Sequence, residues 1–468
     1  MYTYSSISSG STRAHDREPV AAAGVLVDEQ PNYDSATTFD GIDLSVSTTA
    51  KFGGLTGRWW LVSLEDPPID HREQATQNYE RIQNEVISEA KRSILSEYRV
   101  DDFDSVLFIT SAPRGGSSLL FDILRHHERT CSLDGEHDRW YTLNGICYPA
   151  FDSDVVPPDF ESFDREKLLT DLLAEVGATE RSGDRAHRVD NTLVRLPLQF
   201  PNRELPYERI REQLLEGVSL KKILEGFGIA PLQYDEYAER DADSPFETET
   251  IEDRPFVSSH RHKRGLTVDD FERTLILKAS GDAYRLPWIR EQLFPETDSK
   301  VVHLTRNPAA SINGLYDGWQ LHRGFQTYDV GDLDIDGYDG SLWCYDLPPG
   351  WVREGNLIDI CLMQWTQAHR HILDGRDAFE DVLRVRFEDV LTDTESTITE
   401  IVEFADLGES ALLSENVESP NKVMTTKEPR RARWRDREDL VMSALERADE
   451  TYTGVLEELE YTEEREWI

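Results

Sequence analysis

The 468-residue sequence contains few cysteines, little lysine and no long apolar segment. Its four cysteines lie far apart and form no Cys-x-x-Cys pair, which excludes a motif of that kind and favours buried thiols. No run of eighteen apolar residues is present, and the N-terminal stretch MYTYSSISSGSTRAHDREP lacks the basic and then apolar plan of a signal peptide. We therefore expect a cytoplasmic protein with no transmembrane segment.

Basic residues are scarce as well. The chain has 50 Lys and Arg against 91 Asp and Glu, giving a net charge of −41, and 40 of the 50 basic residues are Arg. The summed field of such a protein opposes polyanions, so no nucleic-acid partner is expected. The composition resembles that of proteins from salt-accumulating halophiles, where screening weakens self-repulsion. It predicts a halophilic, archaeal source, with an ordinary acidic cytosolic protein as the alternative.

The chain divides by composition into an extension and one large domain. Residues 1 to 55 are rich in Ser, Thr, Gly and Asp with little periodicity, and predict a weakly ordered N-terminal extension. Residues 56 to 468 are expected to form a single domain. Within it, residues 150 to 270 alternate helical patterns with proline-rich turns, and we interpret them as an inserted segment that covers the site and contacts the acceptor. The oligomeric state is left open.

The most informative stretch is a turn between an expected strand and an expected helix. Val106–Ile109 has the length and composition of a buried strand, and Ser117–Leu124 that of an amphipathic helix. The turn between them, with the two helix-start serines, reads Ala-Pro-Arg-Gly-Gly-Ser-Ser over residues 112–118, which we call the cradle. Its glycines let the backbone bend tightly, and the helix directs free N–H groups into it. The cradle predicts an anion site, with a capped structural turn as the alternative.

Further strand and helix units follow. Leu275–Leu277 is a predicted strand that leads into Lys278, and Val301–Leu304 is another, leading through Arg306 into the helix Ala309–Trp319. Strands that alternate with helices predict an α/β fold, three-layered, with a central parallel sheet whose ligands lie beyond the carboxyl ends of its strands.

Five segments, in order, resemble motifs of the sulfotransferases that use 3′-phosphoadenosine 5′-phosphosulfate (PAPS). The cradle resembles their 5′-phosphosulfate loop, P-[RK]-[SG]-G-[TS]-[TS], and lacks the G-K-[ST] lysine of the usual mononucleotide loop. TLILKASGDAYRLPWIREQLFP resembles a strand and helix that carry a lysine. VVHLTRNPAASINGLYDGW is similar to the 3′-phosphate motif. VRFEDVLTDTESTITEIVEFADL is similar to a common later segment, and EPRRARWRD to the basic loop that folds over the nucleotide.

This resemblance implies a P-loop NTPase-like sulfotransferase fold with a helical insertion, with PAPS as co-substrate and no metal. The implied nucleotide-binding residues are Arg114, Gly115, Gly116, Ser117, Ser118, Arg306, Ser311, Arg433 and Trp434. The family has a serine eight residues after its 3′-phosphate arginine, where this chain has Gly314. Ser311 and Asn313 are the candidate substitutes.

The resemblance also implies catalytic residues. Lys278 resembles the lysine beside the leaving oxygen, Arg114 lies on the phosphosulfate, and Glu136 resembles the general base of the tyrosylprotein branch. His137 and Asp138 are alternative bases. The expected function is transfer of a sulfuryl group from PAPS to a hydroxyl of a small molecule, a sugar or a lipid-linked glycan. A P-loop-type small-molecule kinase and a non-catalytic nucleotide-binding protein are the alternatives.

Overall fold

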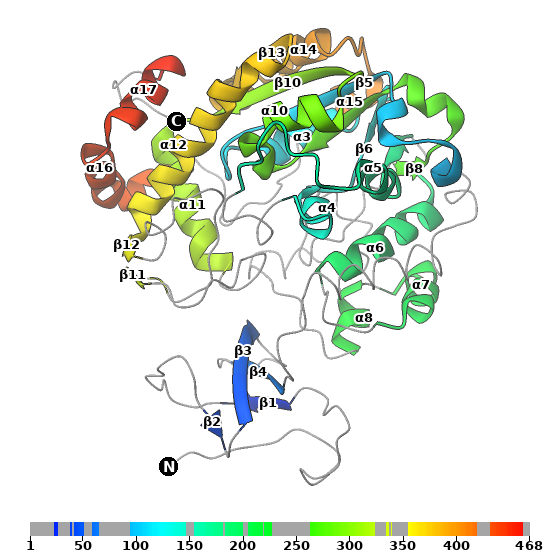
Figure 1. Ribbon diagram of the computed structural model, residues 1–468, viewed down its shortest axis with the longest axis horizontal. Helices are drawn as coiled ribbons and strands as arrows, with labels where there is room; N and C mark the ends of the chain where they lie inside the picture. Colours follow the sequence, from blue (N-terminus) through cyan, green and yellow to red (C-terminus); the bar gives the residue numbers. More distant parts are fainter. Residues whose placement is uncertain are drawn as a thin grey trace.

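The computed structural model describes residues 23–26, 38–39, 42–50, 59–64, 94–146, 154–180, 183–199, 205–218, 220–226, 263–322, 334–336, 338, 354–418 and 431–461. Its centre is a seven-stranded sheet in the order β13-β10-β5-β9-β6-β7-β8 (Figure 1). The strands are β5 (Ser105–Thr110), β6 (Thr130–Ser132), β7 (Gly177–Thr179), β8 (Lys263–Gly265), β9 (Thr274–Lys278), β10 (Asp298–Thr305) and β13 (Asp381–Arg386). The five from β13 to β6 pair in parallel, whereas β7 and β8 join antiparallel.

Strand β5 shows why the sheet needs a helical layer on each face. Its side chains alternate: Leu107 and Ile109 belong to one hydrophobic cluster, Val106 and Phe108 to the other. The first cluster includes residues of α3 (Ser117–Leu124) and α14 (Thr394–Phe404), and the second includes residues of α12 (Leu357–Gly375). A strand that is buried on both faces is typical of a parallel sheet between helices. The predicted three-layer α/β class, with a phosphate-loop-like turn after its first strand, is confirmed.

The structure describes further helices besides α3, α12 and α14. They are α4 (Asp138–Leu143), α5 (Arg165–Leu173), α6 (Arg185–Gln199), α7 (Tyr207–Leu215), α8 (Leu220–Gly226), α10 (Leu286–Trp288), α11 (Pro308–His322), α13 (Phe387–Thr392), α15 (Ala411–Glu418), α16 (Glu438–Glu446) and α17 (Glu450–Glu458). Short helical turns include η3 (Ser280–Tyr284) and η6 (Arg433–Arg437). The segment interpreted as an insertion contributes α5 to α8 and also two strands, β7 and β8, to the edge of the sheet.

Two smaller sheets are also described. Strands β1 (Ala23–Leu26), β4 (Trp59–Leu64), β3 (Ile42–Ala50) and β2 (Thr38–Phe39) form an antiparallel sheet in that order. Strands β11 (Asp334–Asp336) and β12 (Glu354–Asn356) pair in parallel.

Over the described ranges, no helix combines the length and the apolar character that crossing a membrane requires. Cys131 and Cys361 are free, buried thiols, as expected, and the other two cysteines lie outside the described residues.

The parallel strands bring the predicted motifs to one edge of the sheet. The cradle follows β5, Lys278 ends β9, Arg306 follows β10, and Glu136 follows β6 within five residues. In a doubly wound sheet, ligands bind outside the carboxyl ends of strands where the chain changes direction across the sheet. Strand β5 lies at such a point, because the chain passes from it to β6 on one side and later to β10 on the other.

Candidate active site

The cradle is a tight turn whose two glycines leave no room for a side chain. A Cβ atom at Gly115 would lie 2.7 Å from the carbonyl oxygen of Ala112, and one at Gly116, where φ is +100°, would overlap the Phe387 ring. Arg114 also adopts a left-handed conformation, with φ of 64°. The turn leads directly into α3, and the N–H groups that begin a helix point back toward the preceding loop. These features suit a backbone that closes around an anion.

Lys278 connects the cradle with the predicted base. Its Nζ lies 2.9 Å from Ser118 Oγ and 2.5 Å from Glu136 Oε1. Ser280 donates a further hydrogen bond to the same carboxylate oxygen at 3.0 Å. Burial tends to raise the pKa of Glu136, but Lys278 and Ser280 outweigh it and lower that pKa below its ordinary value. The site therefore holds an ionised carboxylate beside a lysine that touches the cradle.

The neighbouring alternatives to Glu136 have different surroundings. His137 is fully buried, whereas the Glu136 side chain is 23% exposed. His137 Nε2 lies 3.1 Å from Asp282 Oδ2, and this pairing outweighs burial and raises the pKa of the imidazole. Burial raises the pKa of Asp138 to about 7, although Arg285 opposes that effect. Of the three, Glu136 combines access to solvent with a contact to Lys278, as a base for a bound acceptor requires.

Arg306 lies beneath the cradle. Its Nη1 donates to the carbonyl oxygen of Arg114 at 3.1 Å, and its guanidinium stacks 4.8 Å from the centre of the Phe387 ring. Burial is the main cause that lowers the pKa of Arg306, to about 10; Glu388 opposes this effect, and Arg114 and Arg433 add repulsion. An anion at this point would relieve the repulsion among the three guanidinium groups.

Gly314 stands where the 3′-phosphate motif that this segment resembles has a serine. A Cβ atom at Gly314 would lie 3.3 Å from Arg114 Cβ, so α11 packs closely against the cradle there. Asn313 Oδ1 accepts a hydrogen bond from Arg437 at 2.6 Å. Ser311 is fully buried, and its hydroxyl makes no hydrogen bond to any described residue. The Ser311 hydroxyl is therefore a donor that no described residue engages, whereas the Arg437 contact uses the acceptor oxygen of Asn313.

The basic tail runs along the same helix. Arg433 and Arg437 both reach Asp317 of α11, at 3.1 and 2.6 Å, and Trp434 between them is buried. A basic stretch of this kind can also be a salt-bridged lead-in to a helix, and these ion pairs fit that alternative. They also hold η6 against α11, two turns or fewer from Ser311 and Gly314.

Two residues of the site were not predicted from sequence. Ser280 shares the Glu136 carboxylate with Lys278, and its place two residues beyond the strand end was the available signal. Phe387 packs on both Gly116 and Arg306. It directly follows β13, and the periodicity of a sequence does not show which turn lies next to the end of that strand.

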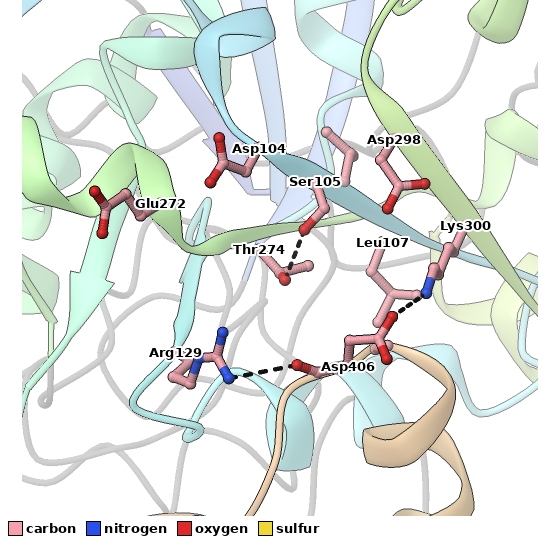
Figure 2. Close-up of a pocket in the computed structure, with 11 residues that line it drawn as sticks. Asp104, Ser105, Leu107, Arg129, Glu272, Thr274, Asp298, Lys300 and Asp406 are labelled. Atoms are coloured by element: carbon pink, nitrogen blue, oxygen red, sulfur yellow. Dashed lines mark hydrogen bonds and ion pairs between the residues drawn. The ribbon is translucent and has the colours of Figure 1, made fainter.

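A cavity of about 220 Å³ lies elsewhere, at the amino ends of the strands (Figure 2). Ser105, Thr274 and Asp298, the first residues of β5, β9 and β10, line it, together with the Lys300–Asp406 ion pair. It contains none of the predicted site residues.

Among the residues that the structure describes, no group of three or more His, Cys, Asp and Glu is arranged to hold a metal ion.

Comparison with known proteins gives structural matches alone. No protein-family model matches the sequence, and no curated protein matches it. A sulfotransferase domain from the Synechococcus PCC 7002 olefin synthase aligns at 15% identity over 78% of this chain and 97% of its own, with a TM-score of 0.34. The sulfotransferase domain from the curacin biosynthetic pathway aligns at 13% identity over 76% of this chain and 98% of its own, with a TM-score of 0.35. A Mycobacterium avium sulfotransferase aligns at 13% identity over 83% of this chain and 84% of its own, also with a TM-score of 0.35. TM-scores this low carry no functional argument, so a function must be inferred from the residues of this chain.

Proposed function

We propose that the protein is a sulfotransferase that moves a sulfuryl group from PAPS to a hydroxyl of a small-molecule or glycan acceptor. The observation that carries the proposal is the contact of Lys278 Nζ with both Ser118 of the cradle and Glu136. It joins an anion-binding turn, a cation and a carboxylate base at one edge of the sheet. These are the three groups that in-line transfer to a hydroxyl requires.

Features of the described residues fit a nucleotide with phosphate groups at both ends. The cradle, with glycines that a Cβ would obstruct, suits the 5′-phosphosulfate. The buried Ser311 hydroxyl and Arg306 suit the 3′-phosphate, because Ser311 offers a hydroxyl donor and Arg306 a guanidinium beside the cradle. Arg433 and Trp434, held along α11, are proposed to complete the nucleotide site.

Each catalytic side chain then has one role. PAPS supplies an activated sulfuryl group when bound. Glu136 accepts the proton of the acceptor hydroxyl as that oxygen attacks sulfur. Lys278 neutralises the charge that develops on the departing phosphate oxygen, and Arg114 with the cradle amides balances the sulfonate oxygens. A kinase of the usual mononucleotide-loop type would instead carry its lysine inside the turn.

Ligand-induced thermal stabilisation tests the nucleotide assignment. The product 3′,5′-diphosphoadenosine (PAP) should raise the melting temperature, because a ligand that binds only the folded state stabilises it. Arg306→Ala and Ser311→Ala should reduce the shift for PAP more than the shift for AMP, which lacks the 3′-phosphate. Arg376→Ala is the control, since Arg376 pairs with Glu458 at the surface. Stabilisation by ATP and not by PAP would contradict the proposal and favour a kinase.

A further inference from the structure

A second group of charges is buried behind the base. Arg195 of α6, Glu175 before β7, Asp134 after β6 and Lys263 of β8 are each 4% exposed or less. They form two ion pairs: Arg195 Nε lies 2.6 Å from Glu175 Oε1, and Lys263 Nζ lies 2.9 Å from Asp134 Oδ1. Burying ion pairs costs desolvation energy that apolar residues would avoid, so stability alone does not account for four buried charges at this place.

These pairs converge on the backbone that carries Glu136. Arg195 Nη2 donates to the carbonyl oxygen of Glu136 at 3.1 Å, and the amide of Asp134 donates to Glu175 Oε1 at 3.0 Å. Between them, a Cβ atom at Gly135 would lie 3.1 Å from both terminal nitrogens of Arg195. The guanidinium therefore packs flat against the peptide that precedes the base, and the glycine leaves room for it.

Glu136 is thus fixed through its backbone while its side chain points to the reaction site. Its carbonyl oxygen is bound by Arg195, and its carboxylate by Lys278 and Ser280. The next residue, His137, is held by Asp282. Since the segment of residues 133–137 contains no regular helix or strand, these contacts define where the carboxylate lies.

We propose that Arg195, anchored by Glu175, is a positioning residue that sets the place of Glu136 against Lys278. The inference rests on the proposed function for its catalytic consequence, but not for the positioning itself. It gives the segment of residues 150–270 a task in catalysis, because Arg195, Glu175 and Lys263 all come from it. A misplacement of a base by about 1 Å costs on the order of 100-fold in rate.

The test compares Arg195→Met with a matched control in the full-length protein. Arg211→Met removes another arginine of the same segment, one whose Nε pairs at 2.8 Å with Asp190 of α6. Hydrogen exchange followed by mass spectrometry should show faster exchange of the amides of residues 133–138 in Arg195→Met and not in Arg211→Met. Unchanged exchange in Arg195→Met would overturn the inference.

Kinetics then separate positioning from a general structural effect. Arg195→Met should lower kcat for sulfate transfer about 10- to 100-fold with KM for PAPS nearly unchanged. In a Glu136→Gln background it should cause little additional loss, since the base is already absent. An equal loss in both backgrounds would contradict the inference.

Two further outcomes are distinguishable. Should Arg195→Met fail to fold, Arg195→Lys replaces it, because lysine retains a charge for Glu175 but cannot also reach the Glu136 carbonyl. Faster exchange of the amides of residues 133–138 is again expected in this variant. Unchanged exchange would again overturn the inference. A wild-type protein that transfers no sulfate, yet shows the predicted change in exchange, would remove the proposed function and leave the positioning of Glu136 supported.

Discussion

Replacement of Glu136 by glutamine is the change that most sharply separates the proposed roles in the site. The amide preserves the shape of the side chain but cannot accept the acceptor's proton. General-base loss typically lowers the rate by about 10² to 10⁴, which corresponds to about 3–6 kcal/mol in the activation free energy at about 1.4 kcal/mol per tenfold. PAP affinity should stay nearly intact, because Lys278 keeps its contact with Ser118 Oγ at 2.9 Å.

The stability of this variant should fall only moderately. Lys278 has a side chain that is 1% exposed, and it loses its carboxylate partner. Breaking a fully buried pair costs about 3–5 kcal/mol. Glu136 itself is 23% exposed, so water can solvate part of the site and the loss should lie below that range.

Steady-state transfer to two acceptors provides the assay. A nitrophenol loses its proton without help, so it should partly rescue Glu136→Gln, whereas an alcohol should not. Lys278→Ala should slow transfer to both acceptors, because it acts on the leaving group. His137→Ala should show no such selective rescue, since its ring is buried against Asp282. Failure of the nitrophenol to rescue Glu136→Gln, with rescue of His137→Ala instead, would move the base to His137.

Three other predictions concern pH and salt. Ser280→Ala should move the acidic limb of the kcat/KM profile to higher pH. The hydrogen bond from Ser280 helps to lower the pKa of Glu136, so without it the carboxylate is protonated at a higher pH. An acidic limb at unchanged pH would exclude that role. Burial lowers the pKa of His369, whose Nδ1 lies 2.9 Å from His303 Nε2, to about 3. Between that value and about 6.5 the unfolded chain binds a proton at this histidine that the folded chain does not, so the free energy of unfolding falls as pH drops below about 6.5. Between pH 7 and 5, urea unfolding should show the wild type losing about 2 kcal/mol more than His369→Gln; equal losses would refute this. With a net charge of −41, the protein should lose circular dichroism signal between molar and millimolar KCl, and an unchanged spectrum would contradict the halophilic interpretation.

The local parts of this structure could be predicted from sequence because their signals are local. The continuous apolar run Val106–Ile109 predicted a buried strand, and the structure buries it on both faces; the two glycines of the cradle predicted the tight turn. The amphipathic helix predicted after the cradle begins at Ser117, as expected. Each of these depends on residues within about a turn or a strand of one another.

The contacts that complete the site depend on strand order, which periodicity does not encode. Glu136 meets Lys278 because β9 lies between β5 and β6, although 142 residues separate the two side chains in sequence. Strand β6 has three residues, too few to show a period of two. The contact between Arg195 and the Glu136 carbonyl involves a backbone atom, so no residue pattern could have indicated it.

Transfer of radiolabelled sulfate from PAPS, measured in high salt with a cell extract as the source of acceptors, tests the central proposal most directly. The wild-type protein should give a labelled product, Glu136→Gln and Lys278→Ala should reduce the label strongly, and Arg376→Ala, the surface control, should label as the wild type does. Absence of label from PAPS, combined with transfer of phosphate from ATP under the same conditions, would contradict the proposal.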